Sequence, residues 1–233
     1  MLFRVWDCET TGMPPDAALC EIGYCDVRTN AGELVDIGDP IGMLVNPKRP
    51  MPPEACAIHH ISDADLADAP PIDKGLIALN HPSVDVFVAH NAAFEQQFFT
   101  GGQKPWICTL KVARRIWPEC PSHTNQCLRY FLGIELDDAL AMPPHRAAPD
   151  AYVTAHILVA AIKSGASLAD MIEWTAGPSL LPRVTFGKHR GTAWSELPGD
   201  YLSWIVNKSE MDADTKFTAR HHLEERRKAA SRS

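Results

Sequence analysis

The chain has 233 residues and a mass of 25.7 kDa, and 45% of its residues are hydrophobic, 22% charged and 8% aromatic. This length suits one large domain or a medium domain with a small module, and the composition excludes a disordered, collagenous or coiled-coil chain. The formal net charge of −7 excludes a protein that binds nucleic acid through an overall positive charge, so a polyanion has to meet local basic patches or metal ions held by carboxylates.

Location and redox state follow from simple patterns. The most apolar stretch, residues 152–162, is shorter than the roughly 18 residues of a membrane span, so no membrane association is expected. Arg4, Asp7 and Glu9 interrupt the apolar start, so no signal peptide is expected. The seven cysteines lack the Cys-x-x-Cys spacing of structural zinc sites, which predicts reduced thiols and a cytoplasmic protein.

Strands are predicted mainly in the first part of the chain. Four short apolar segments read as strands: residues 2–9, 21–27, 40–47 and Val84 to Ala89. The polar segment Thr29–Gly32 is typical of a hairpin turn, and the proline-rich segment 46–62 predicts a short helix or a loop.

Helices are predicted between and after these strands. They cover residues from about Ala92 toward Phe99, 110–119, 124–134 with Thr124 as N-cap, and about Arg146 to Ser164. Strands first, with helices between and after them, favour an α/β fold in which helices pack on the faces of a mixed sheet.

The composition changes after Gly165, which indicates a domain boundary. Residues 166–177 predict a linker helix that ends at Gly177-Pro178, and a new segment begins there. We therefore predict a domain of residues 1–165, a small module of residues 178–224 and a disordered charged tail of residues 225–233.

Asp7 and Glu9 form the first group of candidate site residues. They lie two residues apart at the end of an apolar strand, so their side chains share one face. A solvated strand edge would also explain the pair. Asp7 follows an apolar dipeptide directly, however, and a carboxylate there is costly unless it is paired or bound to a cation. The turn at Thr10-Thr11-Gly12 could bring backbone groups close to a ligand.

The second group follows the strand that ends at Ala89. His90 and Asn91 come first, and Glu95 lies about one turn into the next helix. Taken alone, these residues are also explained as strand-end caps and a solvated glutamate near a helix N-terminus.

The third group lies at the start of the longest helix. Asp150 shares the i, i+3, i+7 spacing of the apolar face with Val153 and Ile157, and a carboxylate facing a core is rarely left unpaired. His145 precedes this helix. The His-x4-Asp spacing is not specific, because His60 and Asp65 repeat it in a loop.

Together, four carboxylates and one histidine can converge on one edge of a sheet. Hard oxygen ligands without cysteine or paired histidine select Mg²⁺ or Mn²⁺ over zinc. Paired divalent ions about 3.5–4 Å apart serve phosphoryl-transfer enzymes, and a neutral histidine suits the role of general base.

The same segments resemble a known family. VWDCETTG, VAHNAAFE and HRAAPD are similar to the three acidic motifs of the DEDD exonucleases, in the version with a histidine before the last aspartate (DEDDh). AIHHIS, WICTLKVARRIWP and HRAAPDAYVTAHIL further resemble the catalytic domain of the bacterial exonuclease X group, and GPSLLPRVTFGKHRG resembles the start of its carboxy-terminal module. The resemblance spans nearly the whole chain and implies an RNase H-like fold with a mixed five-stranded sheet flanked by helices.

Matching the motifs residue by residue implies the roles of the site residues. Asp7, Glu9, Asp150 and Glu95 would hold two divalent ions, Mg²⁺ or Mn²⁺, with Asp7 bridging them, and His145 would be the general base. At Glu95 the family pattern has aspartate, which leaves the position of the second metal open.

The resemblance also implies contacts to the substrate. Thr10, Thr11 and the segment His59–Ser62 with Ile61 would touch the terminal nucleotide and its 3′ hydroxyl, and Asn91 and Phe94 match the second motif. In the module, the loop around Lys188 and Arg190 could grip nucleic acid, although a solvated hairpin turn explains it equally well. The segment DYLSWIV would supply a small core, including Trp204.

The resemblance implies a 3′–5′ exonuclease that hydrolyses phosphodiesters from the 3′ end of DNA and releases 5′-mononucleotides, with single-stranded DNA as the expected partner. Water activated by His145 and one metal would attack the phosphorus, and the second metal would stabilise the departing 3′ oxygen. Two alternatives stay open. One is an exoribonuclease that trims RNA 3′ ends. The other is a relative in which Glu95 makes catalysis weak and which binds nucleic-acid ends. An interaction role for the residues after Gly177 is a further possibility.

Overall fold

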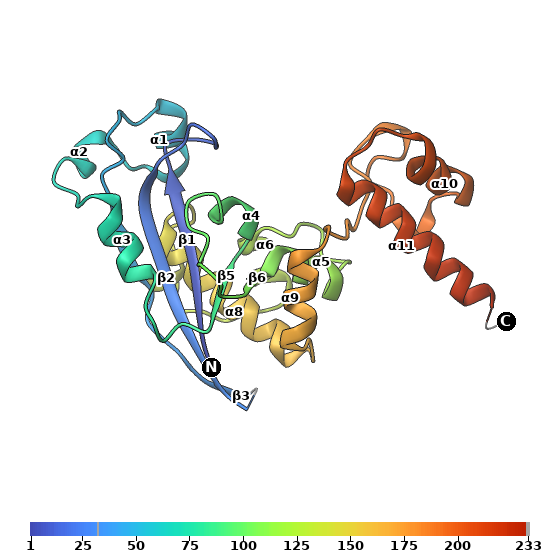
Figure 1. The fold of residues 1–233 in the computed structure, drawn as a ribbon, viewed down its shortest axis with the longest axis horizontal. Coiled ribbons are helices and arrows are strands. Elements are labelled where there is room, and N and C mark those ends of the chain that lie inside the picture. The colour runs from blue at the N-terminus through green and yellow to red at the C-terminus, as the bar shows by residue number, and fades with distance from the viewer. Residues whose placement is uncertain (32, 232–233) are drawn as a thin grey trace.

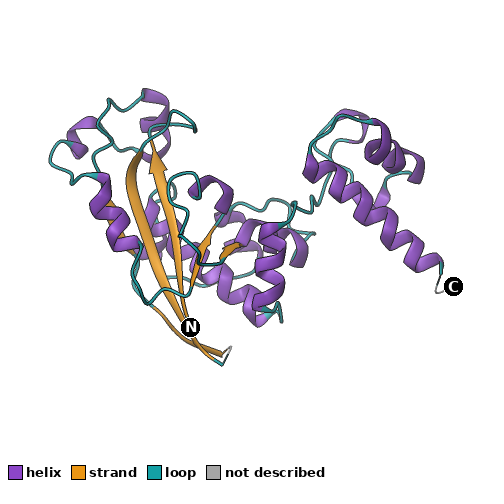
Figure 2. Ribbon diagram, in the orientation of Figure 1, coloured by secondary structure: helices purple, strands orange, loops and turns teal. Residues whose placement is uncertain are grey.

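The computed structural model describes residues 1–31 and 33–231 (Figure 1). A mixed sheet with helices packed around it forms the larger part, and a smaller helical unit at the C-terminus lies to one side (Figure 2). The predicted turn Thr29–Gly32 and the predicted tail each include positions outside the described residues, namely 32 and 232–233.

Within the described residues the sheet contains six strands: β1 (Leu2–Thr10), β2 (Leu19–Asn30), β3 (Glu33–Ile37), β4 (Ile41–Leu44), β5 (Val86–Ala89) and β6 (Trp106–Cys108). β1 pairs antiparallel with β2 and parallel with β5, and β5 pairs parallel with β6. The strand order is β3-β2-β1-β5-β6, and β4 also pairs with β2. The predicted mixed sheet is confirmed.

The sheet has six strands rather than the five that the resemblance implies, because β2 is long enough to pair with two short strands. β4 pairs with β2 from Glu21 to Tyr24, and β3 pairs with it from Val27 to Asn30. β3 is almost wholly exposed. It therefore lacks the buried apolar face on which strand prediction depends, and the sequence analysis missed it.

The helices of the larger part are α1 (Pro53–His59), α2 (Asp63–Leu66), α3 (Ile72–Leu79), α4 (Ala92–Glu95), α5 (Thr109–Ile116), α6 (Asn125–Phe131), α7 (Asp138–Ala141), α8 (Ala147–Lys163) and α9 (Leu168–Ala176). The long helix α8 lies where it was predicted. The helix predicted from Ala92 toward Phe99 ends at Glu95, because the chain turns there and the ring of Phe99 packs against Trp6 and Phe87.

The alternation of side chains along β1 decides which face carries the acids. Phe3 and Val5 pack in the core cluster that contains α8, whereas Trp6 and Cys8 pack in the cluster on the opposite face. Side chains two residues apart share a face, so Asp7 and Glu9 point to the α8 side of the sheet. The first turn of α8 carries Asp150.

A glycine in β2 lets α8 approach the sheet at this point. Gly23 pairs with Asp7 across the strands, and a Cβ at Gly23 would lie 2.1 Å from the backbone carbon of Ala147. A side chain at this position is therefore sterically excluded. The contact brings the N-terminus of α8 down onto the strand pair that carries the acids.

We expect Gly23→Ala to destabilise the protein by about 3 kcal/mol or more, since the added methyl group forces backbone to move rather than a flexible side chain. Gly38→Ala is the matched control, because its Cβ would meet only the Asp26 carbonyl oxygen at 3.6 Å. Urea unfolding followed by circular dichroism measures both. Equal stabilities of the two variants would contradict the close contact.

The carboxy-terminal unit has its own core. It contains the 3-10 turns η1 (Gly187–His189) and η2 (Trp194–Glu196) and the helices α10 (Gly199–Lys208) and α11 (Ala213–Ala230). Trp194, Leu202 and Ile205 are buried together with Ala219 of α11. Lys111 of α5 donates to the carbonyl oxygens of Thr175 and Gly177 and so ties the linker to the larger part.

Two predictions for this unit are wrong. Residues 225–230 are helical rather than disordered: they continue α11, and Arg226 among them donates to the carbonyl oxygens of Ser195 and Leu197. Trp204 was assigned to the small core, but 43% of it is exposed. The core face of α10 is formed by Leu202 and Ile205, and Trp204 lies on the other side of the helix.

No single helix in the described part of the chain is long and apolar enough to cross a membrane. By length and composition, only α8 and α9 together meet this criterion, and they are bent by 120°.

Candidate active site

Three of the predicted carboxylates meet at the end of β1. Asp7, Glu9 and Asp150 each offer an oxygen, and these oxygens lie within 4.8 Å of one another. The first two come from the sheet and the third from α8, so residues more than 140 positions apart are joined by the close packing at Gly23. The arrangement is compact enough for three oxygens to bind one cation.

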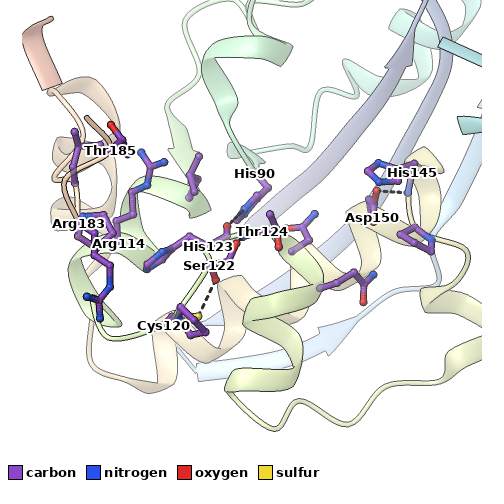
Figure 3. Close-up of a pocket in the computed structure, with 17 residues that line it drawn as sticks. His90, Arg114, Cys120, Ser122, His123, Thr124, His145, Asp150, Arg183 and Thr185 are labelled. Carbon is purple, nitrogen blue, oxygen red and sulfur yellow. Dashed lines mark hydrogen bonds between the residues drawn. The ribbon is translucent and has the colours of Figure 1, made fainter. Parts of the chain in front are cut away.

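His145 lies beside this cluster at the entrance to α8. Its backbone N–H donates to Asp150 Oδ2 over 2.9 Å, which fixes the loop to the carboxylate. The residue has a φ of 60°, a left-handed conformation that is uncommon outside glycine, and it is exposed. Figure 3 shows His145 and Asp150 at one end of a cavity of about 660 Å³.

The fourth predicted carboxylate is close by but outside the group of three. Glu95 is only 3% exposed, and its Oε2 has no hydrogen-bond partner among the described residues. Burial raises the pKa of Glu95 to about 8, and the nearby Glu9 raises it further. An unpartnered, buried carboxylate beside three others is an arrangement that a cation would stabilise.

Burial and mutual repulsion dominate the electrostatics of the cluster. Burial, followed by the charges of Asp150 and Glu95, raises the pKa of Asp7 well above its ordinary value. Burial raises the pKa of Glu9 to about 8, with a further contribution from Asp150, and burial also raises the pKa of Asp150. The ionised cluster is therefore costly without a positive charge, and its all-oxygen donor set fits a hard divalent ion.

Sequence reasoning missed the ion pair that holds this end of α8. Arg146 donates to both carboxylate oxygens of Glu21, with Nη2 at 2.7 Å, and the N–H of Ala147 donates to the same carboxylate over 2.9 Å. Glu21 lies opposite Glu9 in the β1–β2 pair, where two like charges repel each other. Arg146 compensates this repulsion and anchors α8 to β2. The visible signal was an acid inside an otherwise apolar strand.

The predicted substrate residues of the first motif line a second cavity. Glu9, Thr10, Thr11 and His59 surround about 400 Å³ on the β1 turn, so the carboxylates lie between this space and the larger cavity. The Thr10 hydroxyl donates to the carbonyl of Gly12, and the Thr11 hydroxyl accepts the N–H of Ala18. Both hydroxyls therefore also fix the shape of the turn.

His59 and Ile61 are both buried. His59 Nδ1 accepts the N–H of Ile61, so its Nε2 carries the proton and faces the carbonyl oxygen of Thr10 at 3.3 Å. Burial lowers the pKa of His59, which favours this neutral ring. Ile61 packs with Met51 and Leu66 in a small separate cluster. His59 therefore both lines the second cavity and supports the turn, whereas Ile61 lies behind the turn in the core.

The second motif is divided between core and surface. His90 is neutral, because burial lowers its pKa to about 4, and its two nitrogens lie at hydrogen-bond distance from Thr109 Oγ1 and the His123 carbonyl. Asn91 is exposed at the start of α4 with a φ of 89°. Phe94 is partly buried against the core on the α4 side. Lys188 and Arg190 are exposed on the carboxy-terminal unit, away from the carboxylates.

Comparison with known proteins agrees with this geometry. Residues 5–158 match the exonuclease family. Exodeoxyribonuclease 10 of Escherichia coli strain K12 is 35% identical over 229 residues, which cover 96% of this chain and 99% of the relative. The PolC-type DNA polymerase III of Bacillus cereus is 31% identical over 69% of this chain, but the match covers only 11% of that polymerase.

Solved structures give the same result. Exonuclease X in complex with 5′ overhanging duplex DNA is 33% identical with a TM-score of 0.63, and the match covers 74% of this chain and 99% of that one. The nuclease domain of 3′hExo, a DEDDh family member bound to rAMP, shares the fold with a TM-score of 0.56 at 16% identity. The predicted RNase H-like fold is confirmed, and this family uses divalent metal ions, which suit the acidic cluster. The chain therefore belongs to the exonuclease family and is a 3′–5′ exonuclease that hydrolyses phosphodiester bonds.

Proposed function

We propose that this exonuclease removes nucleotides one at a time from the 3′ end of DNA and releases 5′-mononucleotides. The observation that carries the proposal is the convergence of Asp7, Glu9 and Asp150 within 4.8 Å, beside His145 and the buried Glu95. The names of two relatives, an exodeoxyribonuclease and a nuclease bound to duplex DNA with a 5′ overhang, support DNA as the substrate.

Two divalent ions, Mg²⁺ or Mn²⁺, would be held by Asp7, Glu9, Asp150 and Glu95. When bound, they supply positive charge that offsets the carboxylates and the charge developing on the phosphate. The chain itself supplies the base. His145 is exposed beside the cluster, so its ring can take a proton from the attacking water. The hydrogen bond from its backbone N–H to Asp150 keeps the residue beside the cluster.

The smaller cavity is our proposed site for the terminal nucleotide. Thr10, Thr11 and His59 line it directly, and the backbone N–H of Ile61 holds the His59 ring in place against the turn. Asn91 and Phe94 would contribute at the start of α4. A terminal nucleotide in this space would place its phosphate at the carboxylates. The rest of the strand, on the 5′ side of that phosphate, would extend through the larger cavity.

An assay with three 5′-labelled substrates tests the proposal: single-stranded DNA, duplex DNA with a 5′ overhang, and RNA of the same sequence. We expect shortening of both labelled DNA substrates in Mg²⁺ or Mn²⁺ and no reaction in EDTA, and chromatography of the unlabelled nucleotides that are released should give 5′-mononucleotides. Preferential shortening of the RNA would identify a trimming exoribonuclease instead. Undiminished activity in EDTA would exclude the two-metal site.

Glu95 gives a specific prediction for the metal site. Its side chain is one methylene longer than the aspartate of the family pattern, and Mn²⁺ tolerates irregular coordination better than Mg²⁺. We expect a higher ratio of Mn²⁺ to Mg²⁺ activity in this protein than in its Glu95→Asp variant, and severe impairment of Glu95→Gln. Initial rates in each metal measure the ratio. Full activity of Glu95→Gln would show that Glu95 has no part in the metal site.

We also propose a cytoplasmic location. The seven cysteines are all free thiols, and five of them are buried. Burial raises the pKa of Cys20 and Cys25 to about 12, which keeps these thiols protonated and unreactive. A reducing compartment suits such a set.

A further inference from the structure

The positive charge of this chain is concentrated away from the catalytic carboxylates. Residues 178–233 hold 10 Lys and Arg against 7 Asp and Glu, whereas residues 1–177 hold 12 against 22. The first 177 residues thus have a net charge of −10 and the remainder +3. Because the affinity for a polyanion depends on cations that contact its phosphates, the catalytic part alone is poorly suited to hold a long strand.

The carboxy-terminal unit carries a row of three rings, which we call the ring face: Trp204 is exposed, and Tyr201 and His189 beside it are partly buried. Tyr201 and Trp204 are stacked, with ring centres 5.6 Å apart and an interplanar angle of 21°, and His189 lies 4.7 Å from Tyr201. The core side of α10 is formed by Leu202 and Ile205. The core of the unit is therefore complete without Trp204, whose ring is 43% exposed and is available for stacking.

Cations surround the ring face. Lys188 Nζ lies 5.9 Å from the centre of the Tyr201 ring, and Arg190 follows in the same exposed loop. Lys208 lies one helical turn beyond Trp204 on α10, so the two share a side of the helix. The acid next to the rings, Asp200, accepts the N–H of Tyr201. Exposed aromatic rings flanked by lysine and arginine are typical of surfaces that bind single-stranded nucleic acid.

The larger cavity connects this unit with the catalytic residues. Figure 3 shows His145 and Asp150 at one end of the cavity and Arg183 and Thr185 at the other, with His90 and Thr124 between them. Arg183 and Thr185 belong to the segment that leads directly into the loop of Lys188 and Arg190. Arg114 and Arg183 add positive charge to the cavity wall.

We propose that the ring face binds the single-stranded segment of the substrate on the 5′ side of the end that is being removed. A base would stack on the exposed ring of Trp204, which Tyr201 supports by stacking against it, while Lys188, Arg190 and Lys208 contact phosphates. The inference rests on the proposed function, because that function places the 5′ part of the substrate strand in the larger cavity. Paired bases do not offer their faces for stacking, so an unpaired strand fits this surface and a duplex does not.

Binding without hydrolysis gives the first test. We expect the full chain, in EDTA, to bind a fluorescein-labelled dT20. Trp204→Ala should raise the dissociation constant, measured by fluorescence anisotropy, by about 5- to 150-fold. Trp204→Phe, which keeps a ring, should recover most of the affinity. Tyr130→Ala is the matched control, because Tyr130 is an aromatic residue on α6 with 72% exposure. Unfolding temperatures of all variants verify that they are folded.

Salt dependence tests the cations separately. For the double variant Lys188→Ala and Arg190→Ala we expect the slope of log affinity against log salt to fall by about 1.4, since each phosphate contact on a single strand contributes about 0.7. An unchanged slope would show that these two side chains do not contact the strand.

Kinetics on short and long substrates separate this inference from the proposed function. We expect Trp204→Ala to raise KM for dT20 with little change in kcat, and to leave hydrolysis of a dT3 substrate unchanged, because the proposal assigns to the ring face only nucleotides farther to the 5′ side. Normal dT20 affinity and KM in Trp204→Ala would overturn the inference while leaving the exonuclease intact. A wild-type chain that binds dT20 through Trp204 but hydrolyses nothing would overturn the proposed function alone.

Discussion

The Asp7→Asn variant is expected to lose turnover completely while remaining folded. Burial raises the pKa of Asp7 well above its ordinary value, and the charges of Asp150, Glu95 and Glu9 raise it further. Its carboxylate therefore lies where the charges of the site converge. An amide of the same size preserves packing but removes a negative charge, and divalent ions bind an amide oxygen far less strongly than a carboxylate. A gel assay on 5′-labelled dT20 in Mg²⁺ measures the loss.

The same variant is expected to be more stable than the wild-type protein when metal is absent. Folding raises the pKa of Asp7, Glu9 and Glu95, so the folded state binds more protons than the unfolded state between about pH 4.5 and pH 8. The stabilising effect of these protons is complete below the unfolded pKa values and is lost as the pH rises through the folded ones. In EDTA the wild-type melting temperature should therefore be lower at pH 8 than at pH 5.

Removing one charge of the cluster should reduce this pH dependence. Asp73→Asn is the control, because Asp73 is an exposed acid on α3 and its substitution should change neither activity nor the pH dependence of melting. Added Mg²⁺ should raise the melting temperature of the wild-type protein at pH 8 more than that of Asp7→Asn. An Asp7→Asn protein that melts below the wild type at pH 8 in EDTA would show that the carboxylates do not repel one another in the folded state.

Periodicity predicted the parts of the site that local geometry determines. Asp7 and Glu9 face the same side because side chains alternate along a strand, and Asp150 faces the sheet because it continues the apolar stripe of α8. The contacts that these acids depend on come from residues far away in the sequence, and no local sequence pattern predicts them. The bond between Glu21 and Arg146 joins positions 125 residues apart, and the need for glycine at position 23 arises only when α8 is in place.

The predictions that failed concern exposure. β3 is exposed and carries no apolar face, so it was overlooked, and Trp204 was assigned to a core because tryptophan is usually buried. Only the packing of α10 shows that Leu202 and Ile205 fill that core without it. The exposed tryptophan then becomes informative, because a large ring left in solvent beside lysines requires a reason.

A comparison of two histidines shows how context separates a site from a motif. His60 and Asp65 have the same sequence spacing as His145 and Asp150, and both histidines have left-handed backbones, with φ of 58° and 60°. Asp65, however, accepts hydrogen bonds from Ser62 and caps a short helix at the surface. Only Asp150 has two further carboxylates within 4.8 Å. The spacing alone could not distinguish the two pairs.

This pair of histidines supplies the control for the second large effect, the loss of the general base. We expect His145→Ala to lower kcat by about 10²–10⁴, the usual contribution of a positioned acid–base group. The backbone N–H that donates to Asp150 is still present in the variant, so the carboxylate keeps its partner and metal binding should persist. His60→Ala removes an exposed histidine from the same backbone conformation; it lies in the segment expected to touch the terminal nucleotide but outside the carboxylate cluster, so it should leave kcat unchanged whatever its effect on KM.

A further variant identifies the role of the ring rather than of the backbone. His145→Asn accommodates the left-handed conformation well but its amide cannot accept a proton from water, so it should be as slow as His145→Ala. Wild-type rates in His145→Asn would mean that the attacking water loses its proton to another group.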